Sequence, residues 1–235
     1  MNEDIYQRTE ILLGKENVER IKSKHILICG IGGVGSFSLE ALSRIGVGTL
    51  TIVDKDIVDI TNLNRQLIAT LDTVGRKKVD VAKERVNSIN KDITINPIFT
   101  SITKDNISDI FDNKNYDYVI DCVDNIEAKL AIIAECHKRN IRLISSMGMA
   151  NKLNPLEIKV TDIYKTNTCP LAKIIRKRLK EMGIRKQKVV YSTEIPKRKN
   201  DKEKSIYGNT LGSVSFVPSV GGLIIASEVI KDLLN

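Results

Sequence analysis

Short apolar runs alternate with amphipathic stretches through the first 150 residues of the chain. Short apolar runs are typical of buried strands, whereas apolar residues at three- to four-residue spacing indicate helices. Alternation of the two favours a parallel sheet wrapped by helices. We therefore expect an α/β fold with a Rossmann-like, mostly parallel sheet flanked by helices. The predicted strands span residues 26–29, 49–54, 93–100, 116–121 and 141–145, and the predicted helices span residues 34–44, 77–90 and 128–139.

The two ends of the chain differ from this alternating core. Residues 1–22 have the pattern of a helical arm, and after residue 151 the pattern loosens into a shorter strand, a basic helix and a polar loop around 196–207. The apolar run of residues 214–226 contains Pro218 and two glycines. We expect a buried helix there, after a proline-containing loop, and no stable insertion into a membrane.

The length of 235 residues suits a single domain. We expect one unit over residues 1–235, with an arm (1–22), a core (23–150) and a basic segment with a C-terminal helix (151–235).

Positive charge is concentrated in one region. The whole chain carries a net charge of +8, and residues 173–204 contain thirteen Lys and Arg against four acidic residues. Such a local excess suits a partner with a phosphate backbone, although a solvated basic helix face is an alternative. Only Tyr191 and Tyr207 are available there for stacking on bases, so sequence-specific reading of single strands is not indicated.

A glycine-rich loop follows the first predicted strand directly and opens a helix. Its glycines, at the spacing G-x-G-x-x-G, permit a tight turn and let backbone N–H groups approach a phosphate at the positive end of the helix. Asp54 ends the next strand, where its carboxylate can accept hydrogen bonds from ribose hydroxyls. These features alone leave NAD as the default ligand. The glycines are Gly30, Gly32, Gly33 and Gly35.

The residues after Asp54 favour a triphosphate over NAD. Arg65 and Lys78 lie just past the ribose-binding strand and are suited to hold β- and γ-phosphates while charge develops on pyrophosphate. Asp124 follows the strand that ends at Asp121, at the edge where open α/β sheets bind their ligands, and we expect it to hold Mg²⁺. A nucleoside triphosphate together with Mg²⁺ is therefore the expected ligand.

Taken together, these residues resemble the ubiquitin-activating-enzyme superfamily of adenylating domains. The resemblance runs, in family order, through residues 30–36, 54–56, 62–66, 78 and 121–125. It implies transfer of AMP from ATP to a carboxylate in a homodimer, in which Arg8 of one protomer reaches the phosphates of the other. It implies catalytic roles for Arg8, Arg65, Lys78 and Asp124. The further nucleotide-binding residues that it implies are Asp56, Asn62, Gln66 and Asn125.

Three later segments resemble the tRNA threonylcarbamoyladenosine dehydratase subfamily. They are residues 161–172, the strand ending Tyr-Ser-Thr-Glu at 191–194, and the run at 212–218. The resemblance implies adenylylation of the threonyl carboxylate beside the tRNA anticodon, attack by the neighbouring carbamoyl group and loss of AMP.

Two other classes stay open. One is an adenylyltransferase for a ubiquitin-like sulfur carrier, although the chain lacks that group's Cys-x-x-Cys zinc motif. The other is a non-catalytic or NAD-binding module, which would leave Arg65, Lys78 and Asp124 without a role. Whether auxiliary sulfur-transfer proteins take part is open.

The four cysteines are far apart, which argues against a disulfide scaffold and, with no secretory signal visible, favours the cytoplasm. Cys122 is expected to be a small buried residue, and Cys169 lies on an irregular stretch without a visible partner base. Lys129 begins a predicted helix, where it either faces the phosphates or is solvated.

Overall fold

The computed structural model describes residues 5–197, 206, 208 and 210–235. Most of the polar loop predicted at 196–207, with the basic residues between 198 and 204, lies outside the described residues. The chain forms a seven-stranded sheet in the order β3-β2-β1-β4-β5-β7-β6, which confirms the α/β prediction. The strands are β1 (His25–Cys29), β2 (Thr49–Asp54), β3 (Thr94–Phe99), β4 (Tyr118–Asp121), β5 (Leu143–Ser146), β6 (Ile158–Asp162) and β7 (Lys188–Ser192).

Every strand pair is parallel except β6 with β7. β1 lies between β2 and β4 and is in register with both, so that Cys29 is opposite Val53 and Asp121. The chain leaves β1 toward β2 and later returns to the other side at β4. This reversal of strand order creates a crevice at the carboxyl ends of β1 and β4, where ligands of open α/β sheets bind.

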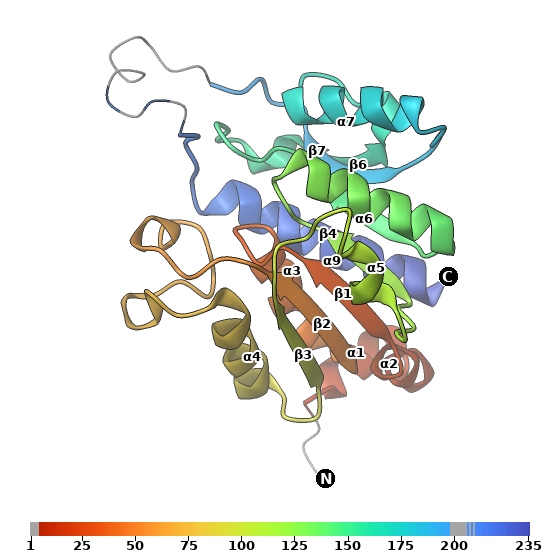
Figure 1. Ribbon diagram of the computed structural model, residues 1–235. Coiled ribbons are helices and arrows are strands. Elements are labelled where there is room, and N and C mark those ends of the chain that lie inside the picture. Colours follow the sequence, from red (N-terminus) through yellow and green to blue (C-terminus); the bar gives the residue numbers. More distant parts are fainter. Residues whose placement is uncertain (1–4, 198–205, 207, 209) are drawn as a thin grey trace.

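Helices cover both faces of the sheet (Figure 1). Alternate residues of β1 belong to two separate apolar cores. Ile26 and Ile28 pack on one face of the sheet, and Leu27 and Cys29 pack on the other. The first core contains side chains of α2 (Lys15–Lys22), α3 (Gly35–Ile45), α4 (Lys78–Ile89) and α9 (Phe216–Leu234). The second contains side chains of α5 (Ile107–Phe111), α6 (Ile126–Arg139) and α7 (Pro170–Glu181).

Three local features differ from the expectations. The N-terminal arm is two helices, α1 (Gln7–Leu13) and α2, because Gly14 between them adopts φ = 83°, where glycine is favoured. Helix α5 was not predicted, since five residues are too few to establish a helical period. Pro218 lies within the first turn of α9 rather than in a preceding loop, and a proline there removes no helical hydrogen bond.

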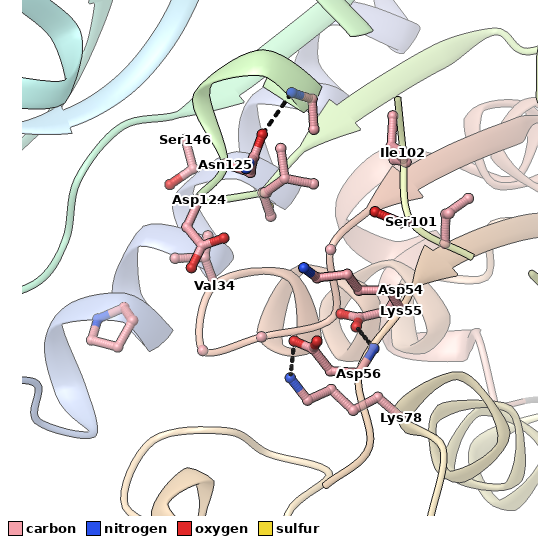
Figure 2. A pocket seen from close by; sticks show the side chains of 18 of the residues that line it. Val34, Asp54, Lys55, Asp56, Lys78, Ser101, Ile102, Asp124, Asn125 and Ser146 are labelled. Carbon is pink, nitrogen blue, oxygen red and sulfur yellow. Dashed lines mark hydrogen bonds and ion pairs between the residues drawn. The ribbon is translucent and has the colours of Figure 1, made fainter. Parts of the chain in front are cut away.

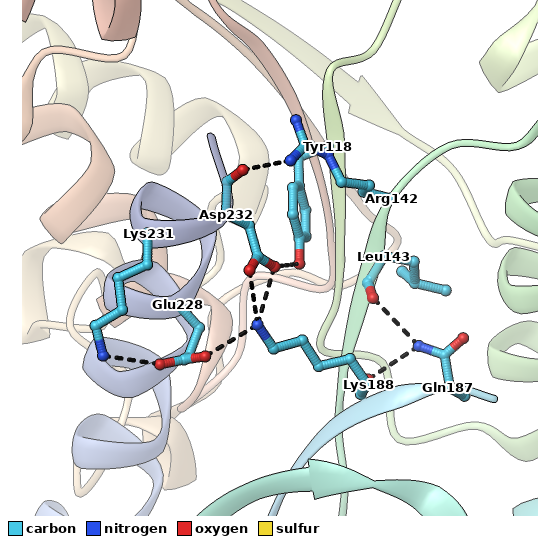
Figure 3. A network of polar contacts seen from close by, with 8 residues as sticks. All are labelled: Tyr118, Arg142, Leu143, Gln187, Lys188, Glu228, Lys231 and Asp232. Carbon is cyan, nitrogen blue, oxygen red and sulfur yellow. Dashed lines mark hydrogen bonds and ion pairs between the residues drawn. The ribbon is translucent and has the colours of Figure 1, made fainter. Parts of the chain in front are cut away.

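The C-terminal helix is fastened to the sheet by a network of polar contacts around Asp232 (Figure 3). Its carboxylate accepts hydrogen bonds from the Tyr118 hydroxyl at 2.6 Å and the Lys188 amine at 2.9 Å. Lys188 also pairs with Glu228 at 2.9 Å, and Arg142 donates to the Asp232 carbonyl. The network joins α9 to β4, β7 and the residue before β5.

None of the described helices combines the length and the apolar character needed to cross a membrane.

Candidate functional site

A cavity of about 960 Å³ opens at the carboxyl ends of β1, β2, β4 and β5. It lies at the crevice that the strand order predicts. Eleven of the twelve predicted nucleotide-binding residues line it, and the twelfth, Gly35, does not. Those that line the cavity are Gly30, Gly32, Gly33, Asp54, Asp56, Asn62, Arg65, Gln66, Lys78, Asp124 and Asn125.

The glycines of the loop serve different purposes. Gly30 has φ = 88°, and a Cβ there would lie 2.9 Å from the Cys122 backbone, so both conformation and space require glycine. At Gly35 a Cβ would lie 1.8 Å from the Gly30 carbonyl oxygen. Gly35 therefore lets α3 begin directly against the loop, which brings the amino end of the helix to the cavity. A Cβ on Gly32 would meet only the Gln66 amide, at 4.0 Å.

Asp54 joins the second strand to the glycine-rich loop. One carboxylate oxygen accepts a hydrogen bond from the Ile31 N–H at 2.6 Å, and the other accepts from the Asp56 N–H at 2.8 Å. The side chain is buried yet lines the cavity. A carboxylate fixed in this way, at the end of β2, is suited to accept from sugar hydroxyls with its remaining lone pairs.

Lys78 is a buried cation at the start of α4. Its amine lies 3.1 Å from the Asp56 carboxylate, while only 5% of the residue is exposed. Asp56 itself is exposed, and its carbonyl accepts from the Lys78 N–H. Figure 2 shows the two side chains meeting at one side of the cavity. A phosphate entering the cavity would find this amine already oriented and largely desolvated.

The segment from Asn62 to Gln66 adds a second group of polar side chains. Asn62 accepts a hydrogen bond from the Asp59 N–H and caps the short 3₁₀ helix Ile60–Asn62, which fixes the segment. The Arg65 guanidinium donates to the Thr61 carbonyl and the Asn64 side chain, and no carboxylate pairs with it in the described residues. Gln66 is buried, and its side-chain oxygen has no hydrogen-bond partner. This oxygen is therefore available to accept a hydrogen bond from a ligand.

Asp124 and Asn125 follow β4 with different geometries. Asn125 accepts from the Ala128 N–H at 2.9 Å and caps α6. Asp124 is exposed, and within the described ranges its carboxylate receives neither a hydrogen bond nor an ion pair.

This arrangement fits Mg²⁺. No cluster of three or more metal-ligating side chains occurs among the residues that the structure describes. Mg²⁺ in nucleotide sites is commonly held by one or two carboxylates together with phosphate oxygens and water, so a single unpaired Asp124 is suited to it.

A buried ion pair below the cavity was not anticipated. The Lys129 amine lies 2.7 Å from the Asp121 carboxylate and 3.0 Å from the Ser146 carbonyl, and the side chains of the pair are fully buried. Burial raises the pKa of Asp121, and Lys129 opposes this by stabilising the charged form. Neither expectation for Lys129 is correct: it faces Asp121 and ties the carboxyl end of β4 to that of β5. Its interior position on α6 could be recognised only once the strand order was known.

The cysteines are free thiols. Burial raises the pKa of Cys122 to about 12, which leaves the thiol protonated and unreactive at neutral pH. Cys122 was expected to be a small buried residue; in the structure it is half-buried, packs beside Gly35 and also lines the cavity. Cys169 is buried and contacts the cavity wall near Gly148.

Arg8 lies far from the cavity of its own subunit. It is exposed on α1, which follows Tyr6, and the Tyr6 hydroxyl pairs with Asn90 while its ring packs on Gly46. Gly46 and Asn90 lead into β2 and β3, so α1 lies at the amino edge of the sheet, opposite to the cavity. Arg8 therefore does not line the cavity within one protomer.

Sequence reasoning overlooked several parts of the cavity wall. Residues 100–105 follow β3, and residues 146–150 begin with the last residue of β5. Both segments line the cavity because their strands end at the same edge as β1. The signal was available in the strand ends, but only the sheet order shows which ends meet. Glu127, which pairs with Lys104 at 3.7 Å and Arg178 at 3.1 Å, lies at the rim.

Comparison with known proteins agrees with this geometry. The tRNA threonylcarbamoyladenosine dehydratase of Bacillus subtilis is 43% identical over 241 residues, which cover 98% of this chain and 94% of the relative. A crystal structure of E. coli tRNA N6-threonylcarbamoyladenosine dehydratase in complex with ATP superposes with a TM-score of 0.89. It is 34% identical, and the match covers 97% of this chain and 93% of that one.

A more distant relative is the molybdopterin-synthase adenylyltransferase of Salmonella typhimurium. It is 34% identical over 61% of this chain and 58% of its own length. The model of the ThiF family matches residues 6–235. The chain therefore belongs to the ThiF family.

Proposed function

We propose that this protein is an ATP-dependent dehydratase that cyclises threonylcarbamoyladenosine beside the anticodon of tRNA. The observation that carries the proposal is similarity to a dehydratase along 98% of the chain, including the segments after residue 150. The cavity adds chemical support, because it combines a glycine-rich loop with cations suited to a triphosphate.

The reaction has two steps. An oxygen of the threonyl carboxylate attacks the α-phosphorus of ATP, and the bond to the β-phosphate breaks to release pyrophosphate. The carbamoyl group of the same nucleoside then attacks the activated carbonyl carbon, loses a proton and expels AMP. The nucleoside loses one water overall, while ATP becomes AMP and pyrophosphate. Because the second step is intramolecular, holding the reacting groups together supplies much of the acceleration.

The residues of the cavity divide the work of binding ATP. The N–H groups at the amino end of α3 approach the phosphates, and Asp54 accepts from the ribose. Arg65 and Lys78 stabilise charge on the departing pyrophosphate, with Gln66, Asn62, Asp56 and Asn125 shaping the surrounding wall. Mg²⁺ at Asp124 would neutralise phosphate charge when bound.

The protein acts as a homodimer in this proposal, with Arg8 reaching the partner subunit's cavity. Ile5, Ile11 and Leu12 on the arm are 66%, 81% and 82% exposed, an apolar surface that a second copy would cover. A mixture of Arg8→Ala and Asp124→Ala proteins should regain activity through hybrid dimers with one intact site. Hybrids shown to form by mass but lacking activity would disprove the role in trans.

Helix α7 is the described part of the tRNA-facing segment. Lys173, Lys177 and Lys180 are exposed at spacings that place them on one helical face. None of the three pairs with an acidic side chain in the described residues, which leaves them available for phosphates. The compartment that we propose, the cytoplasm, is consistent with the free thiols.

The decisive experiment incubates the protein with ATP, Mg²⁺ and tRNA that carries threonylcarbamoyladenosine, and then weighs the released nucleosides. The expected product is lighter by one water, and mild base should return it to the starting mass. An unchanged nucleoside, together with AMP transfer to a small Gly-Gly-ended protein, would favour activation of a sulfur carrier.

A further inference from the structure

The cavity has a second wall, beyond the residues assigned to the nucleotide. Its lining continues from Asp124 and Asn125 to residues 146–150, at the end of β5 and just after it, and to Leu171 on α7. In Figure 2, Ser146 lies beyond Asp124 as seen from Asp56, Lys78 and Ser101. A ligand bound there would be next to the metal-binding carboxylate but on the side away from Lys78.

Gly148 in this wall is a glycine that the fold does not require. Its φ is not positive, and an added Cβ would meet only the Cys169 sulfur at 3.6 Å and the Leu171 Cβ at 3.8 Å, which are ordinary van der Waals contacts. Gly35 is the opposite case, since a Cβ there would collide with the backbone. A glycine free of both constraints, in the wall of a cavity, leaves room for a ligand to approach the backbone closely.

Gly32 has the same property on the nucleotide side. A Cβ on it would meet nothing closer than the Gln66 amide at 4.0 Å, and its φ is not positive. Gly32 and Gly148 therefore mark two places, at the ends of different strands, where no side chain covers the backbone that faces the cavity. Gly32 belongs to the phosphate-binding loop, so we assign Gly148 to a different group of the ligands.

The chemistry of the second wall suits a carboxylate. Within the described residues, the backbone N–H groups of Gly148, Met149 and Ala150 donate to no protein acceptor, whereas the Met147 N–H is used by Val190. The side-chain amide N–H groups of Asn125 donate to no acceptor in the described residues, where the hydrogen bond of this side chain uses only the oxygen, which caps α6. Unpaired donors of this kind are suited to bind anions, and the nearby side chain of Leu171 is apolar.

We propose that Gly148 and the adjoining backbone form the acceptor subsite, which binds the amino-acid carboxylate carried by the modified nucleoside. This inference rests on the proposed function and adds the place where the carboxylate is held before it attacks ATP. The buried Lys129 acts as a positioning residue for the subsite. Its bonds to Asp121 and to the Ser146 carbonyl fix the end of β5 relative to Asp124.

Two valine substitutions separate the subsites. Gly148→Val should leave the melting temperature, ATP affinity by calorimetry and tRNA affinity unchanged, while cyclisation of modified tRNA falls roughly 100-fold, because the carboxylate is displaced from the α-phosphate. Gly32→Val is the matched control and should lose ATP affinity. Gly148→Ala, whose Cβ the structure accommodates, should fold and cyclise tRNA roughly 10-fold more slowly.

The outcomes are distinct. A folded Gly148→Ala or Gly148→Val protein that cyclises tRNA at the wild-type rate overturns the subsite and leaves the proposed function intact. Loss of ATP affinity in Gly148→Val also overturns it, since Gly148 would then belong to the nucleotide side. Wild-type protein that leaves the nucleoside mass unchanged overturns the proposed function and the subsite with it.

Discussion

The cavity and the network around Asp232 both contain charged and polar groups, but within the described residues the cavity leaves several of these groups without a protein partner. In the network, the Asp232 carboxylate, Lys188 and Glu228 are all engaged by protein partners at 2.6–2.9 Å. In the cavity, the carboxylate of Asp124, the side-chain oxygen of Gln66 and the backbone donors of residues 148–150 have no partner in the described part of the chain.

The difference separates stability from function. A satisfied network holds elements together, and removing one of its members leaves another without a partner. Unsatisfied groups in a cavity stabilise nothing in the free protein and gain their bonds only from a ligand. Substitutions in the two regions should therefore have opposite effects on activity and folding.

The largest effect is expected at Asp124. Asp124→Ala should lower ATP-dependent cyclisation by roughly 1000-fold, because it removes the carboxylate that we assign to Mg²⁺ at the site of charge transfer. The melting temperature should not change, since the side chain is exposed and unpaired. Pyrophosphate release and thermal melting measure the two quantities. Near-wild-type turnover would remove Asp124 from the site.

Lys129 resembles the network in being paired with protein groups, Asp121 and the Ser146 carbonyl, but it lies below the cavity. Lys129→Met leaves the buried Asp121 without its partner, which typically costs about 3–5 kcal/mol of unfolding free energy. A second change, Asp121→Asn, removes the unpaired buried charge and should restore part of the lost unfolding free energy. Urea denaturation of the single and double variants provides the comparison, and equal stabilities would contradict the role of the ion pair.

The lysines on the basic face of α7 should behave like the unpaired groups of the cavity, because they have no acidic partner in the described residues and are available to a ligand. Reversal of Lys173, Lys177 and Lys180 to Glu should weaken tRNA binding and lower the slope of log affinity against log salt by about 3, since each lysine accounts for about one phosphate contact. Reversal of Lys83, Lys91 and Lys114, exposed elsewhere, is the control of equal charge change. Similar salt slopes for both triple variants would make α7 an ordinary solvated surface.

The smallest effect is expected in the network. Burial disfavours the charged form of Asp232, but its bonds to Tyr118 and Lys188 outweigh this and lower its pKa. Because the folded pKa is below the unfolded value, the stabilisation is present above about pH 4 and is lost as pH falls through the folded pKa. Asp232→Asn should cost about 1–2 kcal/mol at pH 7.

The difference in unfolding free energy between Asp232→Asn and the wild type should become smaller in acid. The variant should keep its activity at pH 7. Denaturant titrations at pH 7 and at about pH 3 test the pH dependence. A constant difference between the two proteins at both pH values would show that the Asp232 charge does not stabilise α9.

Much of the site could be found from sequence because its residues follow strand ends. Asp54 and Asp124 each come after a buried apolar run, and Gly30 opens the turn after the first strand, so local patterns identify them. Residues 146–150 were not predicted to line the cavity, since Ser-Met-Gly-Met at the end of β5 has no motif that signals a ligand. Its place in the cavity depends on β5 lying beside β4.

The sequence by itself determined the alternation of strands and helices and the glycine-rich turn, because each depends on residues close together in the chain. Tertiary structure alone decided that Lys129 is buried against Asp121, that Arg8 lies at the edge opposite to the cavity, and that Gly148 borders it. The physical reason is the strand order, which sets which strand ends share one crevice. The pattern of residues along the chain can indicate each strand, but it does not show which strands are neighbours in the sheet.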